Sequence, residues 1–410
     1  MSKRVEPEIE TFARIRVVGV GGSGGNAINH MITSKVRGVE FLAVNSDAQD
    51  LHRSLSKRKI HIGKNLTRGL GTGMNPELGK RAAEETRQQI QEALQGSDMV
   101  FITCGMGGGT GTGASAVVAK IAKEVGALVI AIVTKPFGFE GAQRREIAER
   151  GLSELKKEVD AFIVIPNDKL LAVVEQTLSL KQAFALCDEV LREAVEGVSD
   201  IIRTPGDINT DFNDIKAVME GAGPTLMGIG IAEGDDRAKE AAKRAVNSPL
   251  LDISISGAKG VLWVVAHSDD LGIMEVHEAS KIISESVDKG AKIIWGVMKD
   301  EKLKKGQIRI IVIATGFAES AAHASNSGIE RSLFSVPPTE KREEERGRIY
   351  HEILKREDKA ESKSEKAESI VKDEPIVTAT PHKREEIPSV VPEDDETWGA
   401  IPAFLRRNKK

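Results

Sequence analysis

Short apolar runs alternate with longer amphipathic stretches through the first part of the chain. Each run is nearly continuous in apolar residues and therefore predicts a buried strand. These runs lie at 14–20, 40–46, 99–104, 128–134 and 161–166. The intervening stretches, such as 77–94, place apolar residues at helical spacing. Because buried strands that alternate with helices are typical of a parallel sheet covered on both faces, we predict a Rossmann-like, five-stranded α/β domain over 11–178.

A long helix follows this domain. From Ser179 to Arg203 an apolar stripe recurs every three to four residues, and Pro205 and Gly206 end the helix. We predict a central helix over 179–205. Beyond it, the pattern predicts helices at 214–222, 235–246 and 274–287 and strands at 226–232, 260–267, 292–298 and 307–317. The central helix is therefore expected to join the first domain to a smaller, mixed α/β domain over 206–317.

The apolar pattern stops after Phe317. Residues 338–396 are dense in Lys, Glu and Arg, so we predict a charged, flexible linker over 318–396 that forms part of a disordered tail. Residues 397–410 then place Ile401, Phe404 and Leu405 on one face of a short helix, with Arg406 directly after them. An apolar cluster at the end of a charged tether predicts a docking peptide rather than part of a core.

Two glycine-rich loops follow predicted strands. Residues 105–113 are mostly glycine, with Thr110 and Thr112, and a helix start is expected near Gly113. Such a loop brings backbone N–H groups close to an anion, so phosphate binding is a better interpretation than a flexible linker. No lysine follows, which excludes the GxxxxGK[ST] loop. The second loop, within 14–32, has the GxGxxG pattern, which on its own suggests NAD or FAD equally well.

Both loops are expected at the same edge of the sheet, where parallel strands end. Two phosphate-type loops on successive strand–helix units indicate one nucleotide whose phosphates are held from two sides. Three more predicted strand ends join them, at 45–47, 134–141 and 166–168. Asp47 lies where the ribose-binding acid of a dinucleotide fold would lie, which keeps an NAD(P)-dependent oxidoreductase open as an alternative.

Composition narrows the class of protein. The net charge of −4 and the isoelectric point near 6.2 argue against a protein that binds nucleic acid or membrane surfaces in general. Cys104 and Cys187 lie in apolar settings and are expected to be core residues in a reducing compartment. Because no apolar run approaches the ~18 residues of a membrane span, we expect a cytoplasmic protein without direct membrane insertion.

One amide and two acidic side chains follow the central helix, at Asn209, Asp211 and Asp214. Exposed loop acids usually only increase solubility. If the central helix begins beside the nucleotide, however, its far end lies ~35 Å away at about 1.5 Å per residue. Asp211 and Asp214 then cannot reach the nucleotide of their own chain, but they can reach that of another molecule. A contact of this head-to-tail kind produces an open filament unless its rotation closes a ring.

Nine segments in the same order resemble the FtsZ family of tubulin-like cell-division GTPases. The likeness covers about 11–317 and 401–407, and it implies a tubulin-like fold and GTP or GDP as ligand. The segments are VGVGGSGGNA, AVNSDAQ, GLGTGMNPELG, GMGGGTGTGA, PFGFEGAQR, VIPNDKLL, AF…CDEVL, INTDFNDIKAVM and IPAFLRR. The chain departs from the usual pattern at Ser23, where glycine is common, at Thr72, where alanine is common, and at Ser46, where threonine is common.

The resemblance implies a role for each matched residue. The phosphates would be held by Gly21, Gly22, Ser23, Gly24, Gly25, Asn26, Gly107, Gly108, Gly109, Thr110, Gly111 and Thr112. The ribose and phosphate side would contact Glu140 and Arg144, and the guanine would contact Asn167, Phe184 and Asp188. A carboxylate that accepts from N1 and the 2-amino group distinguishes guanine from adenine. For Phe184, simple core packing remains an alternative from the residues alone.

The resemblance also implies hydrolysis between subunits. Asp211 and Asp214, with Asn209, would act in trans on the nucleotide of a neighbouring subunit. Mg²⁺ would be held mainly through the phosphates, and no residue is assigned as a dedicated metal ligand. Such a protein would be a homopolymer of the division ring, at the division site beneath the inner membrane. Alternatives are a tubulin-like GTPase with a shape or partitioning role and a non-hydrolysing scaffold.

The tail peptide would bind other proteins. Ile401, Phe404, Leu405 and Arg406 are expected to contact membrane-tethering and regulatory division proteins, and no nucleic-acid partner is expected. With about 75 flexible residues before it, the peptide would have a reach of roughly 50 Å.

Overall fold

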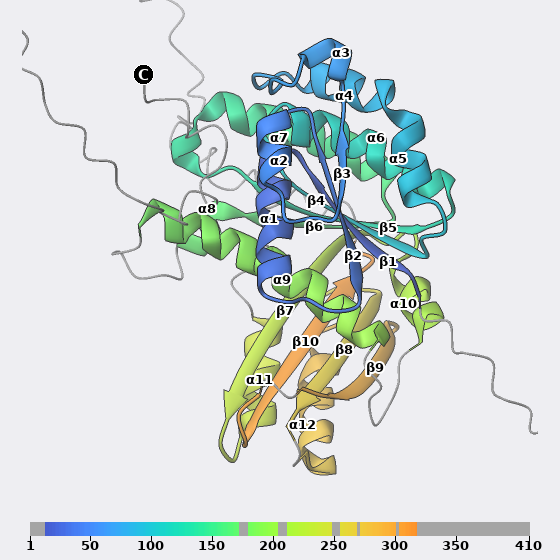
Figure 1. Cartoon of the computed structure of the whole chain (residues 1–410). Helices are drawn as coiled ribbons and strands as arrows, with labels where there is room; N and C mark the ends of the chain where they lie inside the picture. Colours follow the sequence, from blue (N-terminus) through green and yellow to red (C-terminus); the bar gives the residue numbers. More distant parts are fainter. Residues whose placement is uncertain are drawn as a thin grey trace, which may run out of the picture. The chain divides into compact units, whose positions relative to one another are not determined.

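The computed structural model describes residues 13–171, 179–203, 211–247, 255–268, 271–300 and 303–317 (Figure 1). Its strands are β1 (Ile15–Val20), β2 (Val39–Asn45), β3 (Arg58–His61), β4 (Met99–Gly105), β5 (Leu128–Lys135), β6 (Ala161–Pro166), β7 (Gly223–Glu233), β8 (Gly260–His267), β9 (Lys292–Lys299) and β10 (Gln307–Thr315).

Helices follow most of the strands. They are α1 (Gly21–Thr33), α2 (Ala48–Arg53), α3 (Lys64–Thr67), α4 (Pro76–Glu85), α5 (Arg87–Leu94), α6 (Thr110–Glu124), α7 (Ala142–Glu158), α8 (Asn167–Leu171), α9 (Leu180–Arg203), α10 (Phe212–Met219), α11 (Arg237–Val246) and α12 (Ile273–Glu285). A short 3₁₀ turn, Gly138–Glu140, precedes α7.

The strands form one sheet in the order β3-β2-β1-β4-β5-β6-β7-β10-β8-β9. All pairs from β3 to β6 are parallel. In the second half, β10 is antiparallel to both β7 and β8, whereas β8 and β9 are parallel. Only two residue pairs, Ala161–Gly223 and Phe162–Pro224, connect the halves through β6 and β7. The predicted class, a parallel α/β half joined to a smaller mixed half, is confirmed.

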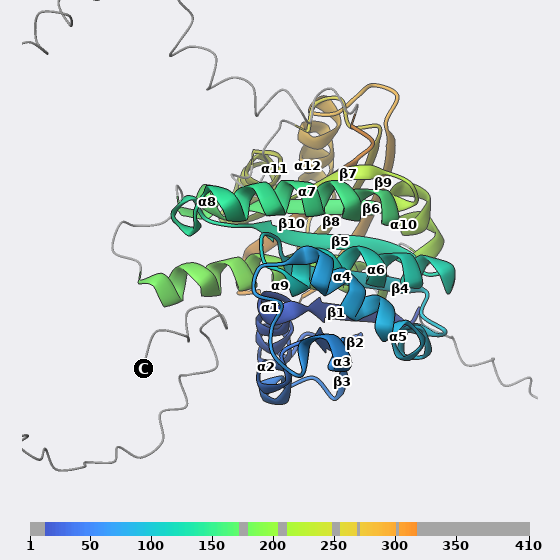
Figure 2. The ribbon, with the colours of Figure 1, turned by 90° about the horizontal axis from the view of Figure 1, so that it is seen from above.

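Helices cover both faces of the first half. On one face α1, α2 and α9 bury their apolar side chains against the sheet, and on the other face α4, α5, α6 and α7 do so. α9 also packs against the second half, where it shares a core with Leu262 and Ile311. The opposite face of the second half is covered by α11 and α12. Figures 1 and 2 both show α8 and α10 at opposite edges of the sheet, that is, at opposite ends of its strands, and α9 extends from the edge with α8 toward the other.

Three local features differ from the predictions. The first half has six strands rather than five, because Arg58–His61 forms the edge strand β3. The predicted helix over 77–94 is two helices, α4 and α5, separated at Thr86. The helix after the glycine loop at 105–113 begins at Thr110 rather than near Gly113. The loop is therefore shorter, and more of its N–H groups belong to the first turn of α6.

Several predicted residues lie outside the described ranges. These are Asn209, the helix-ending Pro205 and Gly206, and the tail residues Ile401, Phe404, Leu405 and Arg406. The domain boundaries given above remain predictions.

Candidate functional site

A cavity of about 510 Å³ opens at the carboxyl edge of the parallel strands. It extends across the sheet from the end of β2 to the end of β6 and the start of α9. Twelve of the seventeen predicted nucleotide-binding residues line it: Gly22, Ser23, Asn26, Gly108, Gly109, Thr110, Gly111, Glu140, Arg144, Asn167, Phe184 and Asp188. The structure therefore brings together residues that are far apart in the sequence.

The two glycine loops lie side by side in the wall of this cavity. Each continues directly from a strand into a helix, α1 at Gly21 and α6 at Thr110. The first N–H groups of a helix have no partner within the helix, and the helix dipole adds partial positive charge there. Two such helix starts at one cavity form an anion site built from backbone donors, which suits phosphate groups.

Five predicted residues shape the loops without lining the cavity: Gly21, Gly24, Gly25, Gly107 and Thr112. Gly21 has φ +73°, and a Cβ there would lie 2.8 Å from the backbone N of Gly111. Gly107 has φ +94°, and its N–H donates to Thr112 Oγ1 at 2.9 Å. The absence of a side chain at these glycines lets the loops approach each other closely.

The far end of the cavity is formed by Asn167, Phe184 and Asp188. Asn167 Oδ1 is buried and has no hydrogen-bond partner among the described residues, although it belongs to a cavity-lining side chain. The Phe184 ring meets the Phe137 ring edge to face, with centroids 5.4 Å apart. Phe184 therefore both packs against the core and lines the cavity, so its two interpretations are compatible.

Asp188 is one helical turn beyond Phe184 on α9 and also faces the cavity. Burial raises the pKa of its carboxyl to about 7, because desolvation disfavours the charged form. The described residues provide no recorded hydrogen bond to this carboxyl. An acceptor that lacks a donor in the protein is matched to a ligand that brings donors, as the N1–H and 2-amino groups of guanine would.

Glu140 and Arg144 interact with each other at the side of the cavity. Arg144 Nη1 donates to Glu140 Oε2 at 3.0 Å, and Glu140 Oε1 accepts from the Phe137 N–H at the same distance. Among the described lining residues, Arg144 is the only Lys or Arg. The cavity therefore attracts anions mainly through backbone dipoles, with one guanidinium beside them.

The cavity also includes residues that the sequence did not assign to binding of a guanine nucleotide. They are Val20, Asn45, Asp47, Gly71, Thr72, Gly73, Met74, Gly105, Met106, Thr134, Pro136, Cys187 and Leu191. Asp47 Oδ1 accepts from the N–H groups of Gln49 and Asp50 and so caps α2. The segment Gly71–Met74 belongs to a matched motif, and its glycines were the available signal that backbone approaches a ligand there.

The predicted catalytic acids lie elsewhere. Asp211 is exposed and Asp214 is partly exposed at the start of α10. Asp211 Oδ1 accepts from the Asp214 N–H at 2.8 Å, so Asp211 caps this helix. Neither residue lines the cavity.

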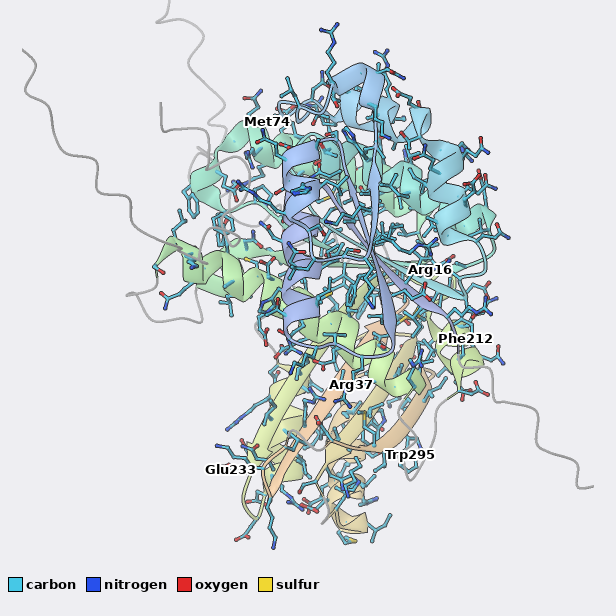
Figure 3. All side chains as sticks on the ribbon, in the orientation of Figure 1. Arg16, Arg37, Met74, Phe212, Glu233 and Trp295 are labelled. Carbon is cyan, nitrogen blue, oxygen red and sulfur yellow. The ribbon has the colours of Figure 1, made fainter. Side chains whose placement is uncertain are left out.

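α10 lies at the amino edge of the sheet. It ends at Met219, and the Gly223 N–H that follows donates to Asp160 O, just before the first residue of β6. The cavity lies at the other end of β6, because its lining residue Asn167 comes directly after the last residue of that strand. Figure 3 shows the same separation, with Met74 of the cavity and Phe212 of α10 on opposite sides of the first half. In this fold Asp211 and Asp214 are therefore remote from the cavity of their own chain.

Two negative findings concern the described residues. They contain no group of three or more His, Cys, Asp or Glu side chains arranged to hold a metal ion. Their helices also include none that combines the length and the apolar character needed to cross a membrane.

Comparison with protein families gives two matches. The family described as "Tubulin/FtsZ family, GTPase domain" matches residues 14–175. The family described as "FtsZ family, C-terminal domain" matches residues 223–318.

Solved structures give the same picture. An FtsZ dimer from M. jannaschii, in the empty state, is 48% identical with a TM-score of 0.71, and the match covers 75% of this chain and 89% of that chain. GDP-bound CetZ1 from Haloferax volcanii is 22% identical with a TM-score of 0.65, over 74% of this chain and 94% of that chain. A GTPγS-bound protofilament of CetZ2 from the same organism is also 22% identical, with a TM-score of 0.65, over 78% and 100%. At 22% identity, the CetZ likeness shows the fold alone.

Proposed function

Because this chain belongs to the Tubulin/FtsZ family of GTPases, we propose that it assembles head to tail and hydrolyses GTP between neighbouring subunits. The family supplies GTP binding and hydrolysis. Self-association is supported by the solved FtsZ dimer. The proposal adds which residues bind the nucleotide, and which subunit supplies the catalytic acids.

One observation carries the proposal: the cavity and the acids lie at opposite edges of one sheet. The cavity has an anion site and an unpartnered amide oxygen, Asn167 Oδ1, but its acids have other roles. Glu140 is paired with Arg144, Asp47 caps α2, and Asp188 lies at the end away from the glycine loops. Asp211 and Asp214 are exposed or partly exposed and do not line this cavity. Head-to-tail stacking brings the two edges together.

We assign guanine to the end of the cavity formed by Asn167, Phe184 and Asp188. The ionised Asp188 carboxylate would accept from N1–H and from the 2-amino group, which adenine cannot reproduce. The Phe184 ring packs against Phe137 in a T-shaped contact, so its orientation is restrained before ligand arrives. The phosphates would then follow the sheet edge toward the two glycine loops and the starts of α1 and α6.

Hydrolysis in this arrangement is attack of water on the γ-phosphorus with cleavage of the bond to the β–γ bridging oxygen. Asp211 and Asp214 of the adjacent subunit would orient and polarise that water, while the glycine-loop N–H groups hold the phosphate oxygens. Phosphoryl transfer depends mainly on such positioning and charge compensation. Mg²⁺, held through the phosphates, would supply part of the charge compensation.

The test is phosphate release measured against protein concentration, together with GTP binding and pelleting in GTP or GDP. Turnover per molecule should rise steeply at the concentration where pelleting begins. Asp211→Asn and Asp214→Asn should each lower turnover roughly 100-fold, the usual scale for a general acid or base, and leave GTP affinity within about twofold. Asn keeps the helix-capping oxygen of α10, so loss of the cap does not confuse the result.

Asp236→Asn is the matched control. Asp236 is an exposed acid at the start of α11, and its side chain makes no capping hydrogen bond. This variant should hydrolyse GTP at the wild-type rate. Equal loss of binding and turnover in Asp211→Asn or Asp214→Asn would contradict the assignment in trans, and so would full turnover at concentrations at which no assembly occurs.

We further propose that the polymer forms the division ring. The 48% identity to an FtsZ and the match of residues 223–318 to the FtsZ C-terminal family support this role. The peptide with Ile401, Phe404, Leu405 and Arg406 would dock on a membrane-tethering division protein and place the polymer beneath the inner membrane. Removal of residues 398–410 should leave GTP-driven assembly intact and abolish recruitment to that partner, and loss of assembly would contradict the docking role.

A further inference from the structure

A charged cluster outside the cavity joins α1 to α9. His30 lies in the last turn of α1, and its Nε2 is 2.7 Å from Glu189 Oε2 on α9. Arg192, one turn further along α9, donates to both oxygens of the same carboxylate, from Nε to Oε2 at 2.9 Å and from Nη2 to Oε1 at 2.6 Å. Two helices that are far apart in the sequence are therefore connected through one carboxylate.

The protonation of Glu189 shows which group donates in this cluster. Hydrogen bonds from Arg192 are the main cause that lowers the pKa of the Glu189 carboxyl to about 2, so the group is ionised at neutral pH and can only accept. His30 Nε2 is therefore the donor. The two bonds from Arg192 fix the orientation of the carboxylate, which favours a stronger contact than an isolated surface pair makes.

Each of the two helices carries one end of the cavity. α1 begins at Gly21 with one of the glycine loops, and α9 carries Phe184 and Asp188. Glu189 directly follows Asp188, so the two side chains project about 100° apart around the helix. Asp188 faces the cavity and Glu189 meets His30 of α1. The pair thus links the helix of the phosphate end to the helix of the base end, one residue away from the proposed guanine acceptor.

The first turns of α9 have few buried contacts to fix their position. Between 179 and 189, Ala183 and Cys187 are the residues that are buried, and Phe184 adds its ring contact with Phe137. Apolar contacts have no preferred direction, whereas a hydrogen bond weakens steeply when its angle or length changes. The bond from His30 therefore restricts the position of α9 along α1, and with it the distance between the Asp188 carboxyl and the glycine loop.

We infer that His30 is a positioning residue for guanine recognition: through Glu189 it holds Asp188 at the distance from the glycine loop that a guanine nucleotide requires. His30 does not line the cavity, so it acts only through α9. This inference rests on the proposed function, since it requires that Asp188 binds guanine. It adds a residue of α1 to the recognition of the base, although the rest of α1 serves the phosphates.

The experiment is a double-mutant cycle on the GTP affinity of the full chain, at protein concentrations below those that allow assembly. His30→Ala should weaken GTP binding about threefold to fivefold, which is the upper range for a partly exposed ion pair. In a chain that carries Asp188→Ala, the same substitution should change GTP affinity by less than about 1.5-fold, because the group that His30 positions is gone. A merely structural role of His30 would weaken binding by the same factor in both chains.

His30→Gln separates position from charge. The Gln side-chain amide reaches about as far as His Nε2 and can donate to Glu189, but it is always neutral. It should recover most of the GTP affinity that His30→Ala loses. If it recovers none, the contact does not act as a positioning hydrogen bond, and the inference is wrong.

Arg87→Ala is the matched control. Arg87 of α5 donates to Glu124, the last residue of α6, and so joins two other helices through a similarly exposed pair. This variant should bind GTP as wild type does. Equal weakening by His30→Ala with and without Asp188, or no weakening in either chain, would overturn the inference alone. Wild-type affinity for GTP in Asp188→Ala would instead overturn the proposed guanine site, and the inference with it.

Discussion

The two edges of the first half of the sheet differ in what they lack. At the carboxyl edge, Asn167 Oδ1 is buried without a donor from the described residues, and partial burial raises the pKa of the Asp188 carboxyl. At the amino edge, Asp211 and Asp214 are accessible and are satisfied by each other's backbone. The first edge therefore has binding groups without a ligand, and the second has two carboxylates without a substrate beside them.

This difference has an energetic side. Burying an unpaired carboxyl costs stability, whereas an exposed capping acid contributes stability at no such cost. A chain that retains the costly group at one edge gains from it only when ligand binds. The unpartnered groups therefore favour a ligand at the cavity, while the acids of α10 give no such signal in the isolated chain and need a test by assembly.

The largest expected effect comes from mixing two inactive variants. One carries Asp211→Asn and Asp214→Asn and keeps the cavity, and the other carries Asp188→Asn and keeps the acids. At GTP levels that fill only the first variant, an equal mixture should reach about a quarter of wild-type turnover. This is more than about 100-fold above either variant alone, because loss of both acids should cost at least ~1000-fold. Phosphate release measures the effect.

A chain that carries all three substitutions is the control for this mixture. When it is mixed with Asp188→Asn, neither component has a cavity filled with GTP, so the mixture should show no gain in turnover. If the first mixture is no more active than the mean of its two components, the acids do not act across an interface and the comparison of the two edges loses its functional meaning.

The second effect is on stability. The pKa of Asp188 is raised to about 7 in the folded protein, above the value of about 3.9 expected in the unfolded chain, so ionisation destabilises the nucleotide-free fold. Stability is therefore lost as pH rises through the interval up to about 7. Asp188→Asn should unfold at higher urea than wild type, and its advantage should grow by roughly 2 kcal/mol between pH 5.5 and pH 8, which corresponds to 1.5 pH units.

Nucleotide separates this explanation from a general packing effect. Saturating GTP should reverse the order of the two proteins at pH 8, because only wild type gains a ligand for its carboxylate. An advantage of Asp188→Asn that is the same at both pH values would mean that burial of the charge is not its cause.

The fold was predictable where the pattern is local and strong. The five apolar strands and the long helix were found because each buries nearly every residue on a face, as Ile15–Val20 and Leu180–Arg203 do. The edge strand β3 was missed because its first residues, Arg58 and Lys59, are exposed and carry no alternation. The break at Thr86 was missed because no Gly or Pro marks it, while its hydroxyl donates to Ala82 O in the preceding turn.

The site was predictable to the extent that its residues lie in glycine loops or matched motifs. The twelve lining residues named from the sequence are of this kind. Thr72 was noted only as a departure from a common alanine, because its place in the cavity wall depends on contacts such as that with Thr110, which is 38 positions away. Contacts between loops on different strands follow from the strand order, and β2, β1 and β4 are not in chain order across the sheet.

A third, smaller effect should appear in the pH dependence of GTP binding. Only the ionised Asp188 accepts two hydrogen bonds from guanine, and about nine-tenths of it is protonated at pH 6 when its pKa is about 7. GTP should therefore bind about tenfold more weakly at pH 6 than at pH 8. Asn does not titrate, so any pH dependence of GTP binding that remains in Asp188→Asn comes from the phosphates. The tenfold change is the difference between wild type and this variant. A parallel pH dependence in the two proteins would place the guanine elsewhere.

The smallest expected effect separates the two roles of Asp211. Its Oδ1 caps α10, and replacing a capping acid with Ala typically costs about 1 kcal/mol, whereas Asn retains the acceptor. The free energy of unfolding measured in urea should therefore be lower by about 1 kcal/mol in Asp211→Ala and unchanged in Asp211→Asn. Both variants should lose turnover. Because the two variants differ in stability and agree in activity, the pair distinguishes a carboxylate needed for hydrolysis from an oxygen needed for the helix. If Asp211→Asn kept wild-type turnover, capping alone would explain why an acid stands at this edge.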